Sequence, residues 1–324
     1  MDLPTIADVR AAADRIADLA VKTPLLTAPV LDERVGGRVL LKAENLQRVG
    51  AFKFRGALNA VRQIDRQAFP GGVVACSSGN HAQGVACAAK LCGMPAAIVM
   101  PRDAPEAKRR RTAGYGAEVV LYDRETEDRE AIAKAIASDR GAAFVHPYDD
   151  PRVIAGQGTV GLELMAQAAA MGHTIDAVLV CCSGGGLASG VSLAVKAANA
   201  ATAVHTVEPA GFDDFARSLA GGQRVGNSAS TGSICDALMA QMPGERTFAI
   251  GRENFGPGLV VTDDEVRAAM RFAFDDLKLV LEPGGAAALA AVLCGKCEAA
   301  GKTVACVLSG GNVDARQFGE IITA

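Results

Sequence analysis

Short runs of aliphatic residues recur along this chain, and segments with alanine-rich or helically spaced apolar positions separate them. Runs of this length, bounded by glycine, proline or polar residues, are typical of buried strands. The runs that we interpret as strands are residues 39–41, 73–76, 96–100, 118–122, 142–145, 177–182, 204–207 and 304–308. Because strands that alternate with helices are joined by right-handed crossovers, this order predicts an α/β fold built on parallel sheets.

The local sequence also marks the starts of helices. TIAD at 5–8 and TDDE at 262–265 are capping boxes, in which a hydroxyl and a carboxylate bond to each other's backbone N–H groups. The second box opens a helix that should run to about Leu277. Further helices are expected at 55–62, up to residue 91, at 108–111, at 127–137, at 158–171 and after residue 285.

The turn-rich stretch HPYDDP at 146–151 indicates a crossing between two domains. The chain has no internal repeat and no low-complexity linker, which favours one domain inserted into another over two domains in tandem. We therefore predict a large domain from residues 1–68 and 149–324 and a small, mobile domain from residues 69–148, each with an open parallel sheet.

Composition narrows the range of partners and compartments. Of the 324 residues 50% are hydrophobic, only 4% are aromatic and none is tryptophan, as is typical of α/β proteins with buried strands. The net charge of -3 provides no basic surface, so we expect no nucleic-acid partner. No apolar run has the length of a membrane span and the N-terminus lacks an apolar signal-peptide core, so we expect no membrane association and a cytoplasmic location.

The nine cysteines fit that location. Most lie inside apolar segments, where free thiols behave as small hydrophobic side chains. Cys294 and Cys297 have the spacing of a metal-binding or redox pair, but they stand alone in an alanine- and leucine-rich run that looks helical. Without a second pair, a structural role is favoured over metal binding or redox chemistry.

One lysine has the surroundings of a nucleophile. Lys53 lies between two phenylalanines in GAFKFRGALN (residues 50–59), just before a predicted helix. Partial desolvation lowers the pKa of an ammonium group, and the free amine can form a Schiff base with a carbonyl or an aldehyde cofactor. Taken locally, the alternative is a surface lysine whose aliphatic stem lies on the core.

A glycine-rich loop follows one of the predicted strands. In SGGGL at 183–187, successive amides at the start of a helix would form an anion-binding nest that suits a phosphate; a plain tight turn is the alternative. The spacing is neither the dinucleotide fingerprint nor the P-loop. A nucleophilic lysine combined with a phosphate site that is not a nucleotide motif indicates pyridoxal phosphate as the cofactor.

Five motifs, in order along the chain, resemble the threonine/serine dehydratase and serine racemase family, and within it serine racemases and threo-3-hydroxyaspartate dehydratases. They are GAFKFRGALN at 50–59, SSGNHAQG at 77–84, SGGGL at 183–187, EPGGAA at 282–287 and LSGGN at 308–312. These enzymes have the fold-type-II pyridoxal-phosphate architecture related to the tryptophan synthase β-subunit. The resemblance covers essentially the whole chain and implies this α/β fold, an amino-acid substrate and a homodimer.

The resemblance also assigns roles to individual residues. Lys53 would be the covalent attachment point of the cofactor and then the base at the substrate α-carbon, and Asn80 would donate to the phenolic oxygen of the cofactor. The implied cofactor-binding residues are Phe52, Lys53, Asn80, Gly184, Gly185, Gly186, Leu187, Glu282 and Ser309. The implied substrate-binding residues are Ser78, Gly79, Asn80, His81 and Arg129.

Ser309 would meet the pyridine nitrogen of the cofactor in these enzymes. A hydroxyl cannot keep that nitrogen protonated as a carboxylate would, so the ring is a weaker electron sink and elimination of a β-hydroxyl is favoured. Ser78 matches the residue that serine racemases place on the face opposite the lysine, which would make it a second catalytic base. A simple N-cap of the following helix is the alternative.

Two further features have a local and a family-based interpretation. An oxygen-only set of possible ligands is formed by Glu208, the carbonyl of Phe212 and Asp214. From the local sequence alone, these residues indicate a solvated turn. The family resemblance instead implies a Mg²⁺ or Ca²⁺ site at this position. Arg129 is locally a helix-surface arginine, but by position it resembles the arginine that contacts dicarboxylate ligands in serine racemases.

We therefore expect an ammonia-lyase that converts a β-hydroxy-α-amino acid to a 2-oxo acid and ammonia. The candidate substrates are L-serine, L-threonine and threo-3-hydroxyaspartate. A serine racemase and a catalytically weak amino-acid-binding module of the same fold are the alternatives. Retention of Lys53, Asn80 and Ser309 together argues against the binding module.

Overall fold

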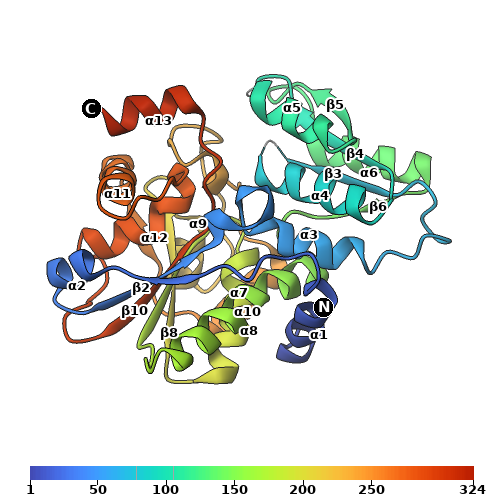
Figure 1. Cartoon of the computed structure of the whole chain (residues 1–324). Helices are drawn as coiled ribbons and strands as arrows, with labels where there is room; N and C mark the ends of the chain where they lie inside the picture. Colours follow the sequence, from blue (N-terminus) through green and yellow to red (C-terminus); the bar gives the residue numbers. More distant parts are fainter. Residues whose placement is uncertain (78, 105) are drawn as a thin grey trace.

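The computed structural model describes residues 1–77, 79–104 and 106–324, and this part of the chain contains two open sheets with helices on their faces (Figure 1). Six strands form the large sheet in the order β1 (Leu25–Thr27), β2 (Arg38–Ala43), β10 (Thr303–Leu308), β7 (Ala177–Cys181), β8 (Ala203–Pro209) and β9 (Leu259–Val261). β1 pairs antiparallel with β2, Leu26 opposite Leu41, and the other strand pairs of this sheet are parallel. The sequence did not predict β1, because three residues carry no periodic pattern.

Helices cover both faces of the large sheet. Its central strands are buried on both sides, as parallel strands between helical layers are. Figure 1 shows α7 and α8 on one face and α11 and α12 on the other. The helices of this part are α2 (Pro29–Val35), α7 (Pro151–Ala170), α8 (Gly186–Ala198), α9 (Asp214–Gly221), α10 (Glu245–Asn254), α11 (Asp263–Asp275), α12 (Pro283–Leu293) and α13 (Ala315–Ile322).

The small sheet has four parallel strands in the order β5 (Glu118–Tyr122), β4 (Ala96–Pro101), β3 (Val73–Cys76) and β6 (Ala143–Phe144). Three helices accompany it: α4 (Asn80–Leu91), α5 (Glu106–Gly114) and α6 (Arg129–Arg140). We call these strands and helices the small-sheet lobe. They fall within residues 69–148, although the domain boundaries themselves stay a prediction.

Helix α3 (Lys53–Val61) packs between the parts of the molecule that contain the two sheets. Its buried residues Phe54 and Leu58 share a hydrophobic cluster with Ile98 and Met100 of β4 and not with the core of the large sheet. The same helix contacts both α4 and α7. Lys53, the first residue of α3, is therefore held where the two parts of the molecule meet.

Hydrogen bonds confirm the two predicted capping boxes, whereas several other helix starts lie a few residues away from the predicted ones. Both capping boxes are present, at the start of α1 (Ile6–Ile16) and of α11. The helix expected at 158–171 begins earlier, at Pro151, because the Asp150 side chain accepts from the backbone N–H of Arg152 and proline suits the first turn. The segment 146–151 is thus a turn that ends in a helix cap.

The cysteines are free thiols in this fold. All nine lie within the described residues, and most of them are buried. The sequence placed Cys294 and Cys297 inside a helical run, but Cys294 follows the last residue of α12, so the pair lies beyond the helix. No helix in the described part of the chain is both long and apolar enough to cross a membrane.

Candidate functional site

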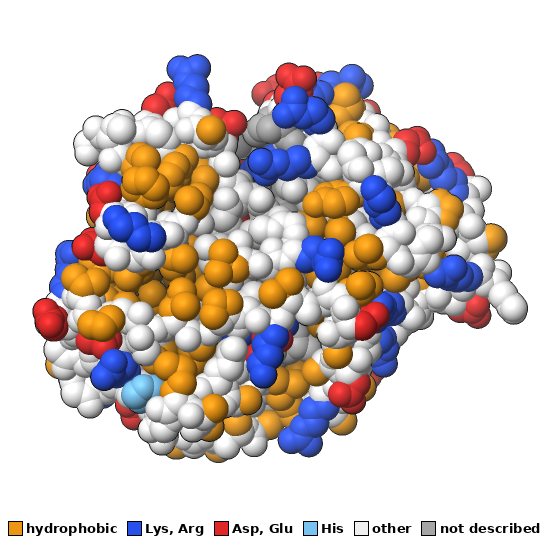
Figure 2. All heavy atoms as spheres, in the orientation of Figure 1, with side chains coloured by type: hydrophobic (Ala, Val, Ile, Leu, Met, Phe, Trp, Pro, Cys, Tyr) orange, Lys and Arg blue, Asp and Glu red, His pale blue; other side chains and the backbone are white. Residues whose placement is uncertain are grey.

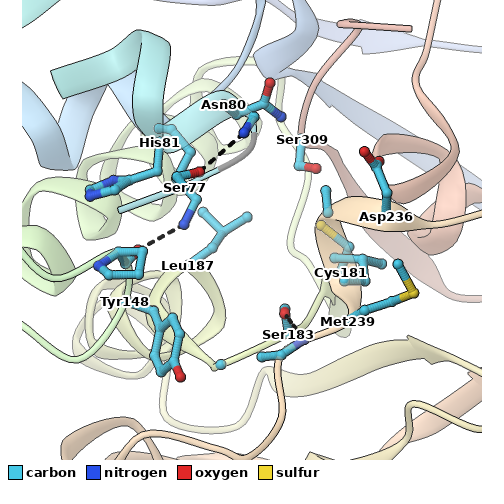
Figure 3. A pocket seen from close by; sticks show the side chains of 18 of the residues that line it. Ser77, Asn80, His81, Tyr148, Cys181, Ser183, Leu187, Asp236, Met239 and Ser309 are labelled. Carbon is cyan, nitrogen blue, oxygen red and sulfur yellow. Dashed lines mark hydrogen bonds between the residues drawn. The ribbon is translucent and has the colours of Figure 1, made fainter. Parts of the chain in front are cut away.

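A cavity opens where the carboxyl ends of β3, β7 and β10 face each other, with residues of both lobes in its wall. Figure 3 shows Asn80 and His81 of α4 on one side and Ser183, Asp236 and Met239 on the other. Ligands of open parallel sheets bind at this edge, because the loops that follow the strands converge there. The cavity is the candidate active site.

Lys53 reaches this cavity from the start of α3. Its Nζ donates a hydrogen bond to the carbonyl oxygen of Pro147 at 2.7 Å and lies 5.3 Å from the centre of the Phe52 ring. Burial away from water lowers the pKa of the Lys53 ammonium to about 8. Roughly a tenth of the amine is therefore unprotonated at neutral pH, and the free amine is the form that attacks an aldehyde.

The glycine loop between β7 and α8 has the geometry of a phosphate site. Gly185 has φ +94°, and a Cβ on Gly184 would lie 2.4 Å from the Tyr148 ring, so side chains are excluded from both positions. Thr247 Oγ1 donates to the Gly184 carbonyl at 2.6 Å and holds the loop. Among the described residues, no acceptor is found for the backbone N–H groups of residues 184–187. These amides, at the start of a helix, suit a phosphate.

Asn80 and Glu282 lie against each other across the cavity. Asn80 Nδ2 donates to Glu282 Oε1 at 2.5 Å, and Asn80 Oδ1 accepts from Asn312 Nδ2 at 2.8 Å. Burial raises the pKa of the Glu282 carboxyl to about 7, and the negative charge of Asp236 adds to this effect. The amide of Asn80 keeps a second N–H group, which is available to an oxygen of the cofactor.

Ser309 links the end of β10 to the lysine loop. Its carbonyl accepts from the backbone N–H of Phe52 at 3.0 Å, and its side chain lies beside the Cys181 thiol. Burial raises the pKa of that thiol to about 11, so Cys181 stays protonated and is not a nucleophile. Ser309 and Cys181 both line the cavity.

Gly79 and His81, near the start of α4, both form hydrogen bonds within the protein. His81 Nε2 donates to the carbonyl of Val145 at 3.1 Å, and burial together with the charge of Lys53 lowers the pKa of His81 to about 3. The imidazole is therefore neutral and is not an acid at physiological pH. The backbone N–H of Gly79 donates to Ser77 Oγ at 3.2 Å. Ser78 lies outside the described residues.

Two cations of the small-sheet lobe line the cavity. Arg129, the first residue of α6, is half-buried there. Lys108 of α5 forms an ion pair with Asp236 at 2.7 Å across the two lobes. The sequence did not single out Lys108, Asp236 or Tyr148; the only signal for Lys108 was its place in a basic helix, which does not reveal the direction of a side chain.

Glu208 and Asp214 form a buried acidic pair apart from the cavity. Glu208 accepts from the backbone N–H groups of Phe215 at 2.9 Å and Ala216 at 2.7 Å, at the start of α9. Burial and the charge of Asp214 raise the pKa of Glu208 well above its ordinary value, and burial raises the pKa of Asp214 to about 6. Asp214 Oδ2 is buried without a hydrogen-bond partner among the described residues.

No group of three or more His, Cys, Asp or Glu side chains in the described chain has metal-binding geometry. The divalent-cation site expected at Glu208, the Phe212 carbonyl and Asp214 therefore stays a prediction.

Comparison with known proteins agrees with this site. The chain matches the family described as pyridoxal-phosphate dependent enzyme over residues 16–310. It is 44% identical to an L-threo-3-hydroxyaspartate ammonia-lyase of Saccharomyces cerevisiae, over 100% of this chain and 98% of that protein. It is 40% identical to a serine racemase of Schizosaccharomyces pombe, over 99% and 98%. The structure of maize serine racemase superposes with a TM-score of 0.92 at 38% identity, over 99% of this chain and 98% of that one.

These matches confirm the resemblance and the fold class that the five motifs implied. The cavity offers what the cofactor of such enzymes needs: a half-buried lysine with a lowered pKa, free amides at a helix start and a hydroxyl at a strand end. The chain belongs to the family of pyridoxal-phosphate dependent enzymes and has their fold-type-II α/β architecture.

Proposed function

We propose that this enzyme is an ammonia-lyase acting on β-hydroxy-α-amino acids, with threo-3-hydroxyaspartate preferred over L-serine and L-threonine. Loss of the α-proton and the β-hydroxyl gives an enamine, which rearranges to the imine and hydrolyses to a 2-oxo acid and ammonia. The bound cofactor supplies the electron sink at the α-carbon. Water and the protein supply the remaining proton transfers.

The residues of the chain divide this work between them. Lys53 is the residue to which the cofactor attaches and the base that removes the α-proton, because its amine is half-buried and its pKa is lowered to about 8. The amides of residues 184–187 would hold the phosphate of the cofactor. Asn80 and Ser309, which line the cavity from opposite lobes, would contact its ring. The amides of 79–81 hold the α-carboxylate, where the positive end of α4 favours an anion.

The preference for a second carboxylate rests on one observation. Arg129 is half-buried in the cavity wall, and within the described chain it has neither an ion-pair partner nor a hydrogen bond. A guanidinium withdrawn from water needs a carboxylate or phosphate partner. The phosphate site lies at the start of α8, so the distal carboxylate of hydroxyaspartate is the better match. Serine and threonine have no such group.

The test is product analysis with the three substrates. We expect 2-oxo acid and ammonia from threo-3-hydroxyaspartate with kcat/KM at least ~10-fold above that for L-serine, corresponding to about 1.4 kcal/mol of discrimination. Equal values for the dicarboxylate and the monocarboxylate substrates would contradict the preference. Formation of D-serine without 2-oxo acid would make the enzyme a racemase. A binding module does not fit the enzyme family to which the chain belongs.

The acidic pair outside the cavity is proposed as a divalent-cation site. Glu208, the carbonyl of Phe212 and Asp214 would bind Mg²⁺ or Ca²⁺, and water would complete the ligand shell. Two buried carboxylates with raised pKa values, one of them with an unpartnered oxygen among the described residues, support this proposal. A cation would offset the repulsion between the two groups.

The enzyme is further proposed to work as a homodimer in the cytoplasm. Figure 2 shows hydrophobic side chains gathered over α11 and α12 on one face of the molecule. Leu46 and Val280, whose loops are joined by a hydrogen bond from Asn45, are 51% and 44% exposed. A second copy of the chain would cover them, and Val280→Asp should then shift the mass measured by light scattering towards the monomer. Nine free thiols suit a reducing compartment.

The division into domains is part of the same proposal. Residues 69–148 would form a small domain that moves against residues 1–68 and 149–324. In support, the hydrogen bonds and ion pair that this segment makes across the cavity are between polar side chains: Lys108 with Asp236, Asn80 with Glu282, and Asn312 with Asn80. Hydrogen exchange should then change along the edges of the cavity when substrate binds.

A further inference from the structure

His146 lies at the centre of the turn that returns the chain from the small sheet to α7. Its Nδ1 accepts from two backbone N–H groups, those of Tyr148 at 3.3 Å and Asp149 at 2.9 Å. A nitrogen that accepts two hydrogen bonds cannot carry a proton, so the proton of the ring sits on Nε2. Nε2 lies 3.5 Å from Glu130 Oε1 on α6. The ring thus connects a turn on one side to a helix on the other.

The turn held by Nδ1 contacts two parts of the candidate cofactor site, Lys53 and the glycine loop. The carbonyl of Pro147 accepts from Lys53 Nζ at 2.7 Å. The Tyr148 ring packs against Gly184 so closely that a Cβ there would come within 2.4 Å, and it lies edge-on to His146 with 4.6 Å between ring centres. A small change in this turn would move the lysine partner and the phosphate loop together.

Asp149 extends the connection to a second helix. Its carboxylate accepts from the backbone N–H groups of residues 245, 246 and 247, at the start of α10. Thr247 in turn holds the carbonyl of Gly184. The turn and the glycine loop are therefore braced against the same helix end.

The Nε2 side of the ring fixes the start of α6. Glu130 is the second residue of this helix and follows Arg129 directly. This contact with His146 lowers the pKa of the Glu130 carboxyl to about 2, so the partner of Nε2 is a carboxylate at physiological pH. The position of Arg129 relative to the turn depends on this contact, because both residues belong to the first turn of the helix.

We propose that His146 is a positioning residue with two separable functions: its Nδ1 sets the turn that holds Lys53 and the glycine loop, and its Nε2 sets the first turn of α6 and thereby Arg129. The first function concerns the cofactor and is independent of the substrate. The second rests on the proposed function, because it assumes that Arg129 receives a distal carboxylate.

Two substitutions separate the functions. In His146→Asn, the side-chain oxygen can replace Nδ1 as the acceptor for the turn, but the side chain is too short to reach Glu130. In His146→Gln, the amide nitrogen can replace Nε2 as a donor to Glu130, while the acceptor for the turn is lost. Glu130→Gln removes the carboxylate and leaves the turn intact. Exposed Glu125→Gln and the distant His173→Asn are the matched controls.

The first function is tested by two measurements. One is cofactor binding by the full chain, measured by absorbance titration. The other is the pH dependence of Lys53 labelling by reductive methylation in cofactor-free protein. His146→Gln should weaken cofactor binding at least ~10-fold and alter the labelling profile. This is the scale expected for the loss of one or two hydrogen bonds to partly buried amides. His146→Asn and both controls should stay within ~2-fold of the wild type. If His146→Gln binds the cofactor and is labelled like the wild type, the first function is refuted.

The second readout is the ratio of KM values for threo-3-hydroxyaspartate and L-serine. His146→Asn and Glu130→Gln should raise KM for the dicarboxylate at least ~5-fold more than for serine, with little change in kcat. Equal effects on the two substrates would refute the second function. If His146→Gln fails to fold, the first function can still be tested with His146→Asn, which keeps an acceptor for the turn. A ~10-fold loss of cofactor affinity in His146→Asn would refute the first function.

The two proposals can fail separately. If threo-3-hydroxyaspartate is not a substrate at all, the proposed function is wrong and the KM ratio loses its meaning. Cofactor affinity and Lys53 labelling would still decide whether His146 sets the turn, since neither involves an amino-acid substrate.

Discussion

Asn80 and Glu282, which lie 202 positions apart in the chain, are joined by a 2.5 Å hydrogen bond across the cavity. Asn80 begins α4 of the small-sheet lobe and Glu282 precedes α12 beside the large sheet. A Cβ on Gly310 would lie 2.2 Å from Glu282 Oε1, so only glycine at that position leaves room for the carboxyl group. The pair is a direct link between the lobes at the cofactor site.

Glu282 should make the stability of the protein depend on pH. Its pKa is raised from 4.5 to about 7 by burial, so the folded protein holds this proton more tightly than the unfolded chain. The contribution is fully favourable below the unfolded value and is lost as the pH rises towards 7, by at most ~3 kcal/mol. Glu282→Gln keeps an oxygen for Asn80 and removes the titration. The melting temperature of Glu282→Gln should therefore rise relative to that of the wild type as the pH increases from 5 to about 8.

The control for this experiment is a carboxyl group that titrates in solvent. Glu125→Gln, an exposed position of the small-sheet lobe, should follow the wild type at every pH. If the difference in melting temperature between Glu282→Gln and the wild type does not change with pH, the carboxyl group of Glu282 is not held in its protonated form.

Lys53→Ala should abolish turnover without unfolding the protein. The variant loses the amine that binds the cofactor and removes the α-proton. It also loses a half-buried ammonium, so its melting temperature should not fall. After borohydride reduction, mass spectrometry should find the cofactor attached to the wild type but not to Lys53→Ala. Lys22→Ala, at an exposed lysine, is the control and should keep the cofactor. A comparable elimination rate in Lys53→Ala would show that another base acts.

Arg129→Ala should distinguish substrates by their charge. With the guanidinium gone, the distal carboxylate of threo-3-hydroxyaspartate would be buried without a partner, at a cost of roughly 2–5 kcal/mol in kcat/KM. L-serine has no such group and should lose little. Arg124→Ala, at an exposed arginine five residues earlier, is the control. Similar losses for both substrates in steady-state assays would remove Arg129 from substrate recognition.

Chelation should lower the thermal stability of the protein. If Glu208, the Phe212 carbonyl and Asp214 bind a divalent ion, Mg²⁺ or Ca²⁺ at 100-fold its dissociation constant adds about 2.7 kcal/mol to the free energy of unfolding. Asp214→Asn should lose this response in differential scanning fluorimetry, while Asp213→Asn, at the neighbouring and more exposed carboxylate, should keep it. A melting temperature that does not respond to chelator or cation would make the pair an ordinary buried turn.

Ser78 stays a prediction from the sequence, because it lies outside the described residues. If its hydroxyl is a second base, the enzyme should form some D-serine from L-serine and should dehydrate D-serine. Ser78→Ala should abolish both reactions while largely sparing elimination from the L-substrate. Because α4 begins at Asn80 with Gly79 at its N-cap, the alternative of an N-cap at Ser78 is not supported. Wild-type enzyme that forms no D-serine and exchanges no α-proton in deuterium oxide would leave Ser78 without a role as a base.

Local features of this protein were determined by the sequence itself. The capping box of Thr5 with Asp8, the glycine loop at 183–187 and the alternation of strands with helices depend on residues close together in the chain. A hydrogen bond that spans three residues or a turn that only glycine can adopt needs no distant partner. For the same reason, the five short motifs were enough to identify the family.

The tertiary structure decided what depends on burial and on distant partners. Arg55, two positions after Lys53, looks like any charged helix residue in the sequence, yet it is 1% exposed between Glu44 and Glu163. The same holds for the turn of His146 and the ion pair of Lys108 with Asp236. A pKa is shifted by the loss of water and by the charges nearby, and both are set by the packing of the whole chain.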